Sequence, residues 1–168
     1  MKHTAIPLTI FFILFQGIAF PQNSVSREFS VDNSDTLGIR VYANVFGKTE
    51  SQSFDSDILK SVISQCEKAA IVPIVGVGPI PPRIPCLTIF VNVFSTQLED
   101  KSYSLSYGGS ISFQREVMVE KGKQSFPVTV PVFYETIYGN EDSIFPVLEE
   151  INKQVGNFLL RYLAANRK

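Results

Sequence analysis

The stretch Cys86–Val119 constrains the fold of this chain more than any other segment, because its side chains alternate in character almost throughout. Its first arm sets Leu87, Ile89, Val91 and Val93 against Thr88, Phe90, Asn92 and Phe94. Its second arm sets Tyr103, Leu105, Tyr107, Ile111 and Phe113 against Ser102, Ser104, Ser106, Ser110 and Ser112. Successive side chains of a strand point to opposite faces, so a period of two indicates half-buried strands. We predict two long strands that turn back on each other at 99–101.

Further extended segments flank this hairpin. The alternation of Leu37–Phe46 predicts a first strand, and Ile71–Val75 predicts a short one before a proline-rich connection that ends at Pro85. Ser125–Tyr138 predicts a last strand that contains two prolines. Proline has no amide hydrogen to donate to a ladder, so we expect this strand at a sheet edge or at a bulge.

Two amphipathic helices are predicted as well. The first begins after Ser53, which can act as N-cap, and carries an apolar stripe that includes Cys66. Pro73 disfavours helical geometry in the residue before it, so this helix cannot pass Val72. The second starts after Asp142 or Ser143 and repeats apolar residues every three or four positions to the end of the chain.

The order of these elements predicts an α+β fold: strand, helix, short strand, three-strand meander, helix. The sheet is expected to be mainly antiparallel, with both helices on one face. The aliphatic face of the sheet is expected to be the buried inner face, and the opposite face is expected to be partly exposed to solvent. The predicted inner residues are Ile39, Val41, Leu87, Ile89, Val91 and Val93.

The N-terminus has the pattern of a signal peptide. A short polar start with Lys2 and His3 precedes an apolar run over 6–15, and Gly17 and Ala19 stand at small-residue cleavage positions. We expect residues 1–19 to be a signal peptide, 20–36 a flexible leader and 37–168 a single α+β domain. The mature protein would be secreted or periplasmic and would have no transmembrane span. An uncleaved membrane anchor is the alternative.

Charge and composition exclude several functions for the mature chain. Removal of Lys2 from 15 basic residues leaves 14 against 16 acidic ones, a formal charge of −2. Such a chain has no basic stripe for nucleic acid or anionic lipid. His3 is the only histidine and leaves with the signal, so imidazole-based catalysis and the commonest metal ligand are lost. We expect no enzyme activity, no cofactor and no metal site.

Two other functions stay open from the sequence. An enzyme could use paired carboxylates or a Ser–Lys pair, although the acidic pairs fall in predicted turns or at a helix start. The acidic pairs are Glu99 with Asp100, Glu141 with Asp142, and Glu149 with Glu150. A small-molecule carrier would instead hold an apolar pocket between the helices and the sheet.

Three aromatic residues are the candidate partner surface. Strand phase puts Tyr42, Phe90 and Phe94 opposite the aliphatic face. Either the leader or a loop folds over them as a second small core, or they stay exposed and bind a partner. A homodimer or an envelope protein is the expected partner.

The two cysteines predict a disulfide. Cys66 and Cys86 are an even pair in a chain that we expect to reach an oxidising compartment. The alternative is two buried free thiols.

Four features follow one another along the chain: Leu87-x-Ile89-x-Val91-x-Val93, Tyr103-x-Leu105, Gly139 and a final motif from Phe158. Their succession resembles small exported bacterial proteins of unknown function. That final motif is Phe158-x-x-x-Tyr162-Leu163-x-x-Asn166. The resemblance covers most of the mature chain at generic fold-forming positions. This chain lacks the tryptophan expected near Tyr134 and has Ala69-Ala70 where a glycine is expected.

The architecture also resembles α/β modules of periplasmic outer-membrane assembly factors. Neither likeness assigns a functional residue. The sequence therefore favours a non-enzymatic binding or envelope-associated protein.

Overall fold

The computed structural model describes residues 29–31, 35–47, 53–75, 84–99 and 102–166. The predicted signal peptide, most of the predicted leader and most of the proline-rich connection lie outside the described residues. The strands are β1 Thr36–Phe46, β2 Val72–Val75, β3 Cys86–Gln97, β4 Tyr103–Lys121 and β5 Gln124–Glu141, and the helices are α2 Phe54–Lys68 and α3 Ile144–Asn166. The predicted α+β class and the predicted order of elements are confirmed.

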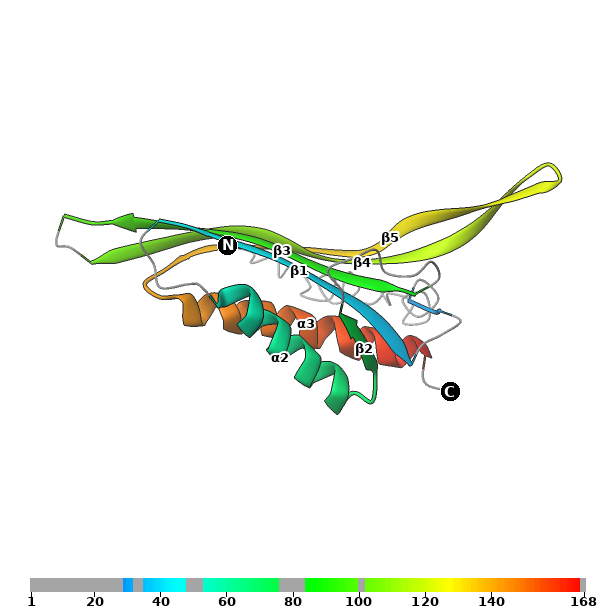
Figure 1. Ribbon diagram of the computed structural model, residues 1–168, viewed down its shortest axis with the longest axis horizontal. Helices are drawn as coiled ribbons and strands as arrows, with labels where there is room; N and C mark the ends of the chain where they lie inside the picture. The colour runs from blue at the N-terminus through cyan, green and yellow to red at the C-terminus, as the bar shows by residue number, and fades with distance from the viewer. Residues whose placement is uncertain (1–28, 32–34, 48–52, 76–83, 100–101, 167–168) are drawn as a thin grey trace, which may run out of the picture.

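The five strands form one sheet in the order β2-β1-β3-β4-β5. β1 runs parallel to both β2 and β3, and β3, β4 and β5 form an antiparallel meander. Parallel neighbours need a crossover connection, which α2 supplies between β1 and β2. Figure 1 shows α2 and α3 on the same side of the sheet. We call the helix-covered side the inner face and the opposite side the outer face.

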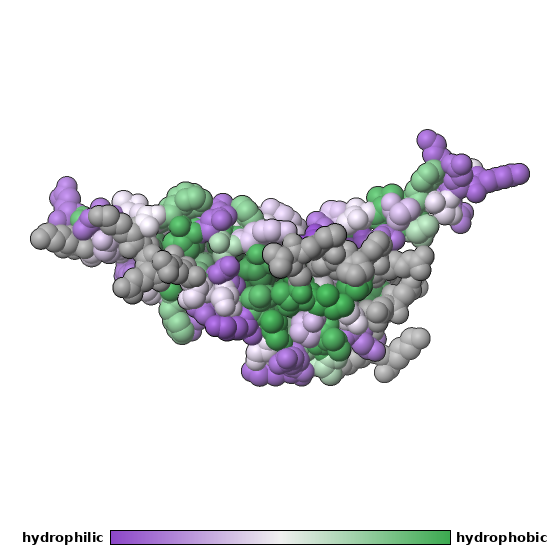
Figure 2. Space-filling view, viewed as in Figure 1, coloured by the Kyte–Doolittle hydropathy of each residue, from purple (hydrophilic) through white to green (hydrophobic). Residues whose placement is uncertain are grey.

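The hydrophobic core lies between the inner face and the two helices. Strand residues of odd number point into it, as the alternation predicted, and the side chains of Leu87, Val91 and Phe113 are fully buried. The helices contribute Ile58, Val62, Cys66, Val147, Ile151, Val155, Phe158 and Tyr162 to this core. Figure 2 shows hydrophobic atoms gathered below the sheet, in the layer where β2 and the helices lie.

Part of the predicted leader belongs to this core. The side chain of Phe29 is 3% exposed and packs against the rings of Phe113, Phe133 and Phe158. Asn166, in the last turn of α3, donates to the carbonyl of Phe29 at 2.8 Å and accepts from the amide of Val31 at 3.0 Å. At these positions the chain is packed rather than free, because aromatic burial and a side-chain amide hold it.

β4 and β5 extend beyond the body of the molecule as a two-stranded arm (Figure 1). The pairing Arg115↔Val130 to Lys121↔Gln124 lies past the end of β3, whose first residue, Cys86, pairs with Gln114. Apolar side chains occupy one side of the arm, while Figure 2 shows hydrophilic residues at its tip. The apolar side consists of Val117, Val119, Phe126, Val128 and Val130. The sequence pattern predicted these strands but not their projection from the body.

The two prolines of β5 are accommodated as predicted. β5 is the outermost strand of the sheet, and its pairing with β4 shifts between Phe113 and Gln114. Phe113 pairs with Phe133 and Gln114 with Pro131, so Val132 is the extra residue of a bulge. Both the edge position and the bulge avoid ladder bonds that Pro127 and Pro131 cannot donate.

The predicted disulfide between Cys66 and Cys86 is wrong, and both cysteines are free and buried. Cys66 belongs to α2 and lies in the core below the inner face. The Sγ of Cys86 lies 3.7 Å from the Oγ1 of Thr88, a residue of the outer face. The sheet therefore separates the two thiols, and the alternation that sets Cys86 beside Thr88 excludes a bridge to the helix.

Within the described residues, no helix combines the length and the hydropathy that a bilayer crossing requires.

Candidate functional site

Both helices lie on the inner side of the sheet, so neither helix covers the outer face (Figure 1). The strand register arranges the side chains of this face in rows across β1, β3, β4 and β5. The rows are Arg40–Thr88–Ser112–Tyr134, Tyr42–Phe90–Ser110–Thr136, Asn44–Asn92–Gly108–Tyr138 and Phe46–Phe94–Ser106–Asn140. Residues far apart in the sequence therefore form one surface.

Aromatic rings project from this surface on both sides of β4. On the β1–β3 side, the predicted partner residues Tyr42, Phe90 and Phe94 are 52%, 40% and 50% exposed. Phe46 stacks on Phe94, with ring centroids 5.0 Å apart and an interplanar angle of 14°. These rings pair with one another across β1 and β3, because the β4 residues of their rows are serines. Together, these four residues form what we call the β1–β3 ridge.

A second row of rings stands on β5. Tyr134 and Tyr138 are 64% and 80% exposed, and they are the β5 ridge. The register pairs Tyr134 with Ser112 and Tyr138 with Gly108. The same two-residue period that identified the first three aromatics assigns these tyrosines to the outer face. Sequence reasoning did not identify them, because only the register between β5 and β4 shows which β4 residues they face.

Between the two ridges, β4 presents only small side chains to the outer face. These are Ser106, Gly108, Ser110 and Ser112, and we call the strip that they line the β4 trough. A Cβ atom placed on Gly108 would meet no atom within 4 Å. Space above Gly108 is therefore open, and packing does not require glycine at that position.

The outer face is rich in neutral hydrogen-bonding groups. Asn44 donates through Nδ2 to the Oδ1 of Asn92 at 2.9 Å, and Ser106 donates to the Oδ1 of Asn140 at 2.7 Å. Among the outer positions of the four rows, Arg40 is the only charged residue. The surface therefore combines rings, hydroxyls and amides with almost no charge.

The candidate carboxylates of the described residues lie after β3, at the end of β5 and in α3. Glu99 follows β3, Asp100 lies outside the described residues, and Glu141 ends β5. Glu149 is an exposed residue of α3. Glu141 and Glu150 come from successive elements, and after the larger effect of burial the charges of both raise the pKa of the Tyr107 hydroxyl.

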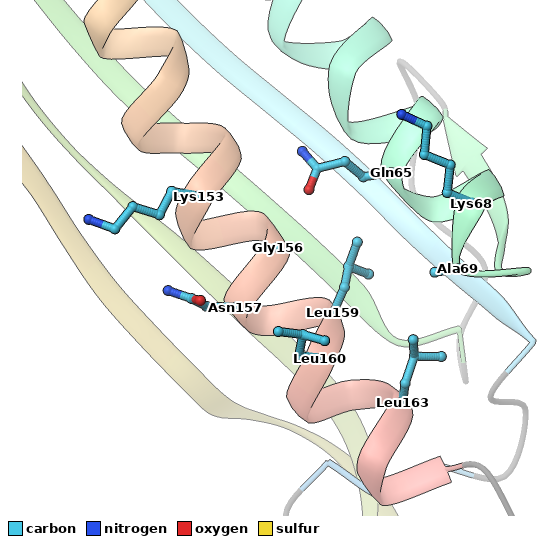
Figure 3. Close-up of a pocket in the computed structure, with 9 residues that line it drawn as sticks. All are labelled: Gln65, Lys68, Ala69, Lys153, Gly156, Asn157, Leu159, Leu160 and Leu163. Carbon is cyan, nitrogen blue, oxygen red and sulfur yellow. The ribbon is translucent and has the colours of Figure 1, made fainter.

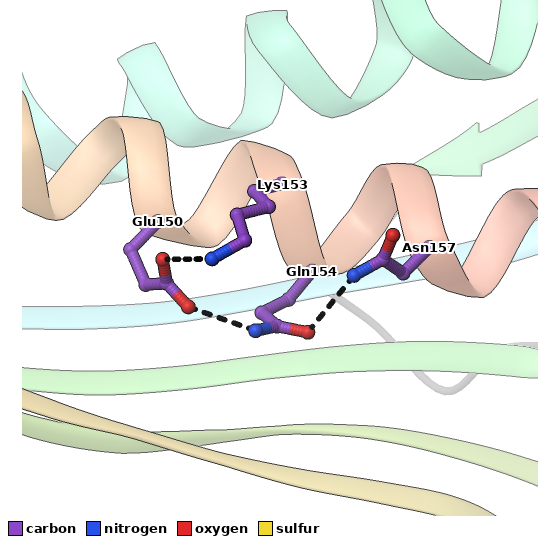
Figure 4. A network of polar contacts seen from close by, with 4 residues as sticks. All are labelled: Glu150, Lys153, Gln154 and Asn157. Carbon is purple, nitrogen blue, oxygen red and sulfur yellow. Dashed lines mark hydrogen bonds and ion pairs between the residues drawn. The ribbon is translucent and has the colours of Figure 1, made fainter.

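Glu150 takes part in a surface network on α3. Its Oε1 accepts from Gln154 Nε2 at 2.8 Å, and its Oε2 accepts from Lys153 Nζ at 3.3 Å (Figure 4). These donors, Gln154 above all, lower the pKa of the Glu150 carboxyl. Asn157 extends the network by a bond of 3.5 Å to Gln154. A carboxylic acid catalyst needs a raised pKa, so this environment suits a structural ion pair better than proton donation.

A hollow lies between the two helices on the helical side of the molecule (Figure 3). It measures about 460 Å³ and has apolar side chains from Leu159, Leu160 and Leu163 beside polar ones from Gln65, Lys68 and Asn157. It lies between α2 and α3 rather than between the helices and the sheet, and it is open to solvent. Its position differs from that of the enclosed apolar pocket expected of a carrier.

No group of three or more potential metal-ligating side chains occurs within the ranges that the structure describes. Cys66 and Cys86 are both shielded thiols. Burial, with a smaller contribution from Glu67, raises the pKa of Cys66 to about 11. Burial also raises the pKa of Cys86, against the opposing influence of Thr88 and Arg40.

Comparisons with known proteins assign neither a family nor a function. No protein family matches the chain, and no curated protein matches it either. A solved structure of an uncharacterized protein is similar at 9% identity and a TM-score of 0.31, over 76% of this chain and 88% of that one. A minor lipoprotein from Acinetobacter baumannii is similar at 13% identity and a TM-score of 0.31, over 79% of this chain and 83% of that one. Likenesses of this order carry no argument about function.

Proposed function

We propose that the protein is a secreted or periplasmic, non-enzymatic binding protein that docks its partner on the outer face of the sheet. The observation that carries this proposal is the exposure of Tyr42, Phe90 and Phe94, at 40–52%, on a sheet face that neither helix covers. Exposed aromatic rings gathered on one face are typical of interaction surfaces, because each ring supplies a large contact area at a small entropic cost. The N-terminal signal pattern supports export.

The two alternative functions have weaker support. An enzyme needs polar groups that converge in a cleft, and Glu150, one of the candidate carboxylates, is held instead in an ion pair with Lys153 on the surface of α3. A carrier needs an enclosed apolar cavity, and the described hollow between α2 and α3 is open. The outer face requires neither a cleft nor a cavity, because partners bind flat sheet faces by stacking and hydrogen bonding.

The proposal is tested by retention of the mature protein on the insoluble envelope fraction of its own cells. We expect Phe90→Ser/Phe94→Ser to reduce retention by about tenfold, since two central aromatic contacts of a binding surface are removed. Phe145→Ser is the matched control, because Phe145 is 62% exposed but lies on α3. Equal retention of the wild type and the double variant would refute the proposal.

Self-association through the same surface has a separate test. Sedimentation of the mature protein would show a homodimer that Phe90→Ser/Phe94→Ser dissociates if two copies meet at their β1–β3 ridges. A monomer at high concentration would exclude the second copy as partner and leave an envelope component.

A further inference from the structure

We propose that the β4 trough binds an uncharged oligosaccharide chain, whose sugar rings lie along β4 between the β1–β3 ridge and the β5 ridge. This inference rests on the proposed function and specifies its ligand class. Four features of the outer face support it: the dimensions of the trough, its aromatic walls, its polar floor and its lack of charge.

The dimensions of the trough fit a single extended chain. Neighbouring strands lie about 4.8 Å apart, so the backbones of β3 and β5 stand about 10 Å apart on either side of β4. Ser106 and Ser112 are six residues apart, which at about 3.3 Å per residue gives a length of about 20 Å. A linear row of several six-membered sugar rings fits this strip, whereas a folded domain would touch mainly the ridges.

The walls supply the apolar contact that a pyranose ring needs. The face of an aromatic ring is electron-rich, and the axial C–H groups of a sugar carry partial positive charge, so the two attract when stacked. Tyr134 and Tyr138 stand on one side of the trough and Phe90 and Phe94 on the other. The two tyrosines also carry hydroxyls that can bond to the rim of a sugar.

The β1–β3 side and the floor of the trough supply neutral hydrogen bonds. The Asn44–Asn92 bond uses one Nδ2 and one Oδ1, so each amide keeps its other group for a ligand. Ser110 and Ser112 add hydroxyls, which can donate or accept. A sugar hydroxyl also donates and accepts, so the two surfaces match in kind.

The charge of the face selects among linear ligands. A nucleic acid strand needs several cations for its phosphates, and Arg40 is the only charged residue among the outer positions of the four rows. An acidic polysaccharide or an anionic lipid surface would lack counter-charges for the same reason. A neutral glycan brings no charge that this face would have to pair.

The open space at Gly108 supports a trough that is accessible to a ligand. A strand interior normally favours side chains larger than glycine, and a Cβ at Gly108 would meet no atom within 4 Å. The fold therefore gains nothing from glycine at this position. Its lack of a side chain keeps the floor open between Asn92 and Tyr138, its neighbours in the row.

The test is calorimetric titration of the mature protein with chitohexaose, a neutral β-linked hexasaccharide. We expect saturable binding that Gly108→Leu, which fills the trough, and Tyr138→Ala, which removes a wall, each weaken about tenfold or more. Phe145→Ala on α3 should bind like the wild type. Hexagalacturonate, an anionic hexasaccharide, should bind at least about tenfold more weakly than chitohexaose.

Absence of saturable binding would overturn the inference. So would equal affinity of the wild type, Gly108→Leu and Tyr138→Ala, or tighter binding of hexagalacturonate. Circular dichroism identifies a variant that fails to fold, and the remaining trough variant then decides. If chitohexaose fails while Phe90→Ser/Phe94→Ser still lowers envelope retention, the glycan inference falls and the proposed function stands. If both measurements are negative, both fall.

Discussion

The rings of Phe29 and Phe113 stack in parallel, with centroids 5.9 Å apart and an interplanar angle of 4°. Phe29 precedes the first strand, while Phe113 lies in β4 near the root of the arm. The contact joins the start of the described chain to the centre of the core. The guanidinium of Arg115 also donates to the carbonyl of Ser30, the residue that follows Phe29.

We therefore expect Phe29→Ala to lower the free energy of unfolding by about 3–5 kcal/mol, the usual cost of truncating a buried phenylalanine. Phe145→Ala is the control, because the side chain of Phe145 is 62% exposed. Urea denaturation of the mature protein measures both. If the two variants have equal midpoints and equal slopes, the packing of Phe29 contributes nothing to stability.

The phase of β3 is tested by Val91→Asp and Thr88→Asp. Val91 is fully buried on the inner face, so an aspartate there would be an unpaired buried charge and should prevent folding. Thr88 lies on the outer face beside Arg40, where an aspartate can remain solvated. Thermal unfolding monitored by circular dichroism compares the two variants. Similar melting temperatures would mean that the faces have been assigned the wrong way round.

Substitution by alanine should affect stability differently at Gly108 and Gly109, which are adjacent in β4. A Cβ at Gly109 would lie 2.1 Å from the carbonyl oxygen of Phe90 and 2.8 Å from the Cα of Val91. Gly109→Ala must therefore displace β3 backbone, and we expect a loss of about 2 kcal/mol or more. Gly108→Ala meets no atom and should be neutral or stabilising by up to about 1 kcal/mol. Urea denaturation ranks the two, and equal stability would contradict the close approach of β3 to Gly109.

Cys66 should make the stability of the protein fall in alkaline solution. An unfolded thiol ionises near pH 9.0, whereas burial raises the pKa of Cys66 in the folded chain to about 11. The unfolded state loses its proton first, so the free energy of unfolding decreases as the pH rises from 9 to 11. The shift corresponds to about 2–3 kcal/mol. Unfolding curves across this pH range should decline less steeply for Cys66→Ala, and parallel curves would refute the assignment.

The thiols also provide a direct check on the corrected disulfide. Mature protein unfolded without reductant should titrate two free thiols per chain, since Cys66 and Cys86 are both free. In the native protein both should react slowly, because both are buried. A titration that finds no free thiol in the unfolded protein would restore the bridge.

Sequence alone determined the elements and the faces of the strands. The two-residue period fixed that Leu87 and Val91 face one way and Phe90 and Phe94 the other, because backbone geometry permits no other alternation. The three- to four-residue period predicted the two helices, and the prolines of β5 predicted either an edge strand or a bulge. These are local consequences of covalent geometry, so the chain itself reveals them.

Only the tertiary structure decided the register between neighbouring strands and several contacts between distant segments. The register sets Tyr138 opposite Gly108 and completes the trough, and a two-residue period within each strand contains no information about its neighbour. Cys66 and Cys86 lie on opposite sides of the sheet, although the sequence predicted a disulfide between them. Phe29 joins the core from a polar segment because three aromatic rings from β4, β5 and α3 surround it. Such contacts depend on packing between distant segments. The hydrophobic effect that drives this packing is non-directional, so the pattern of one segment does not specify which segment packs against it.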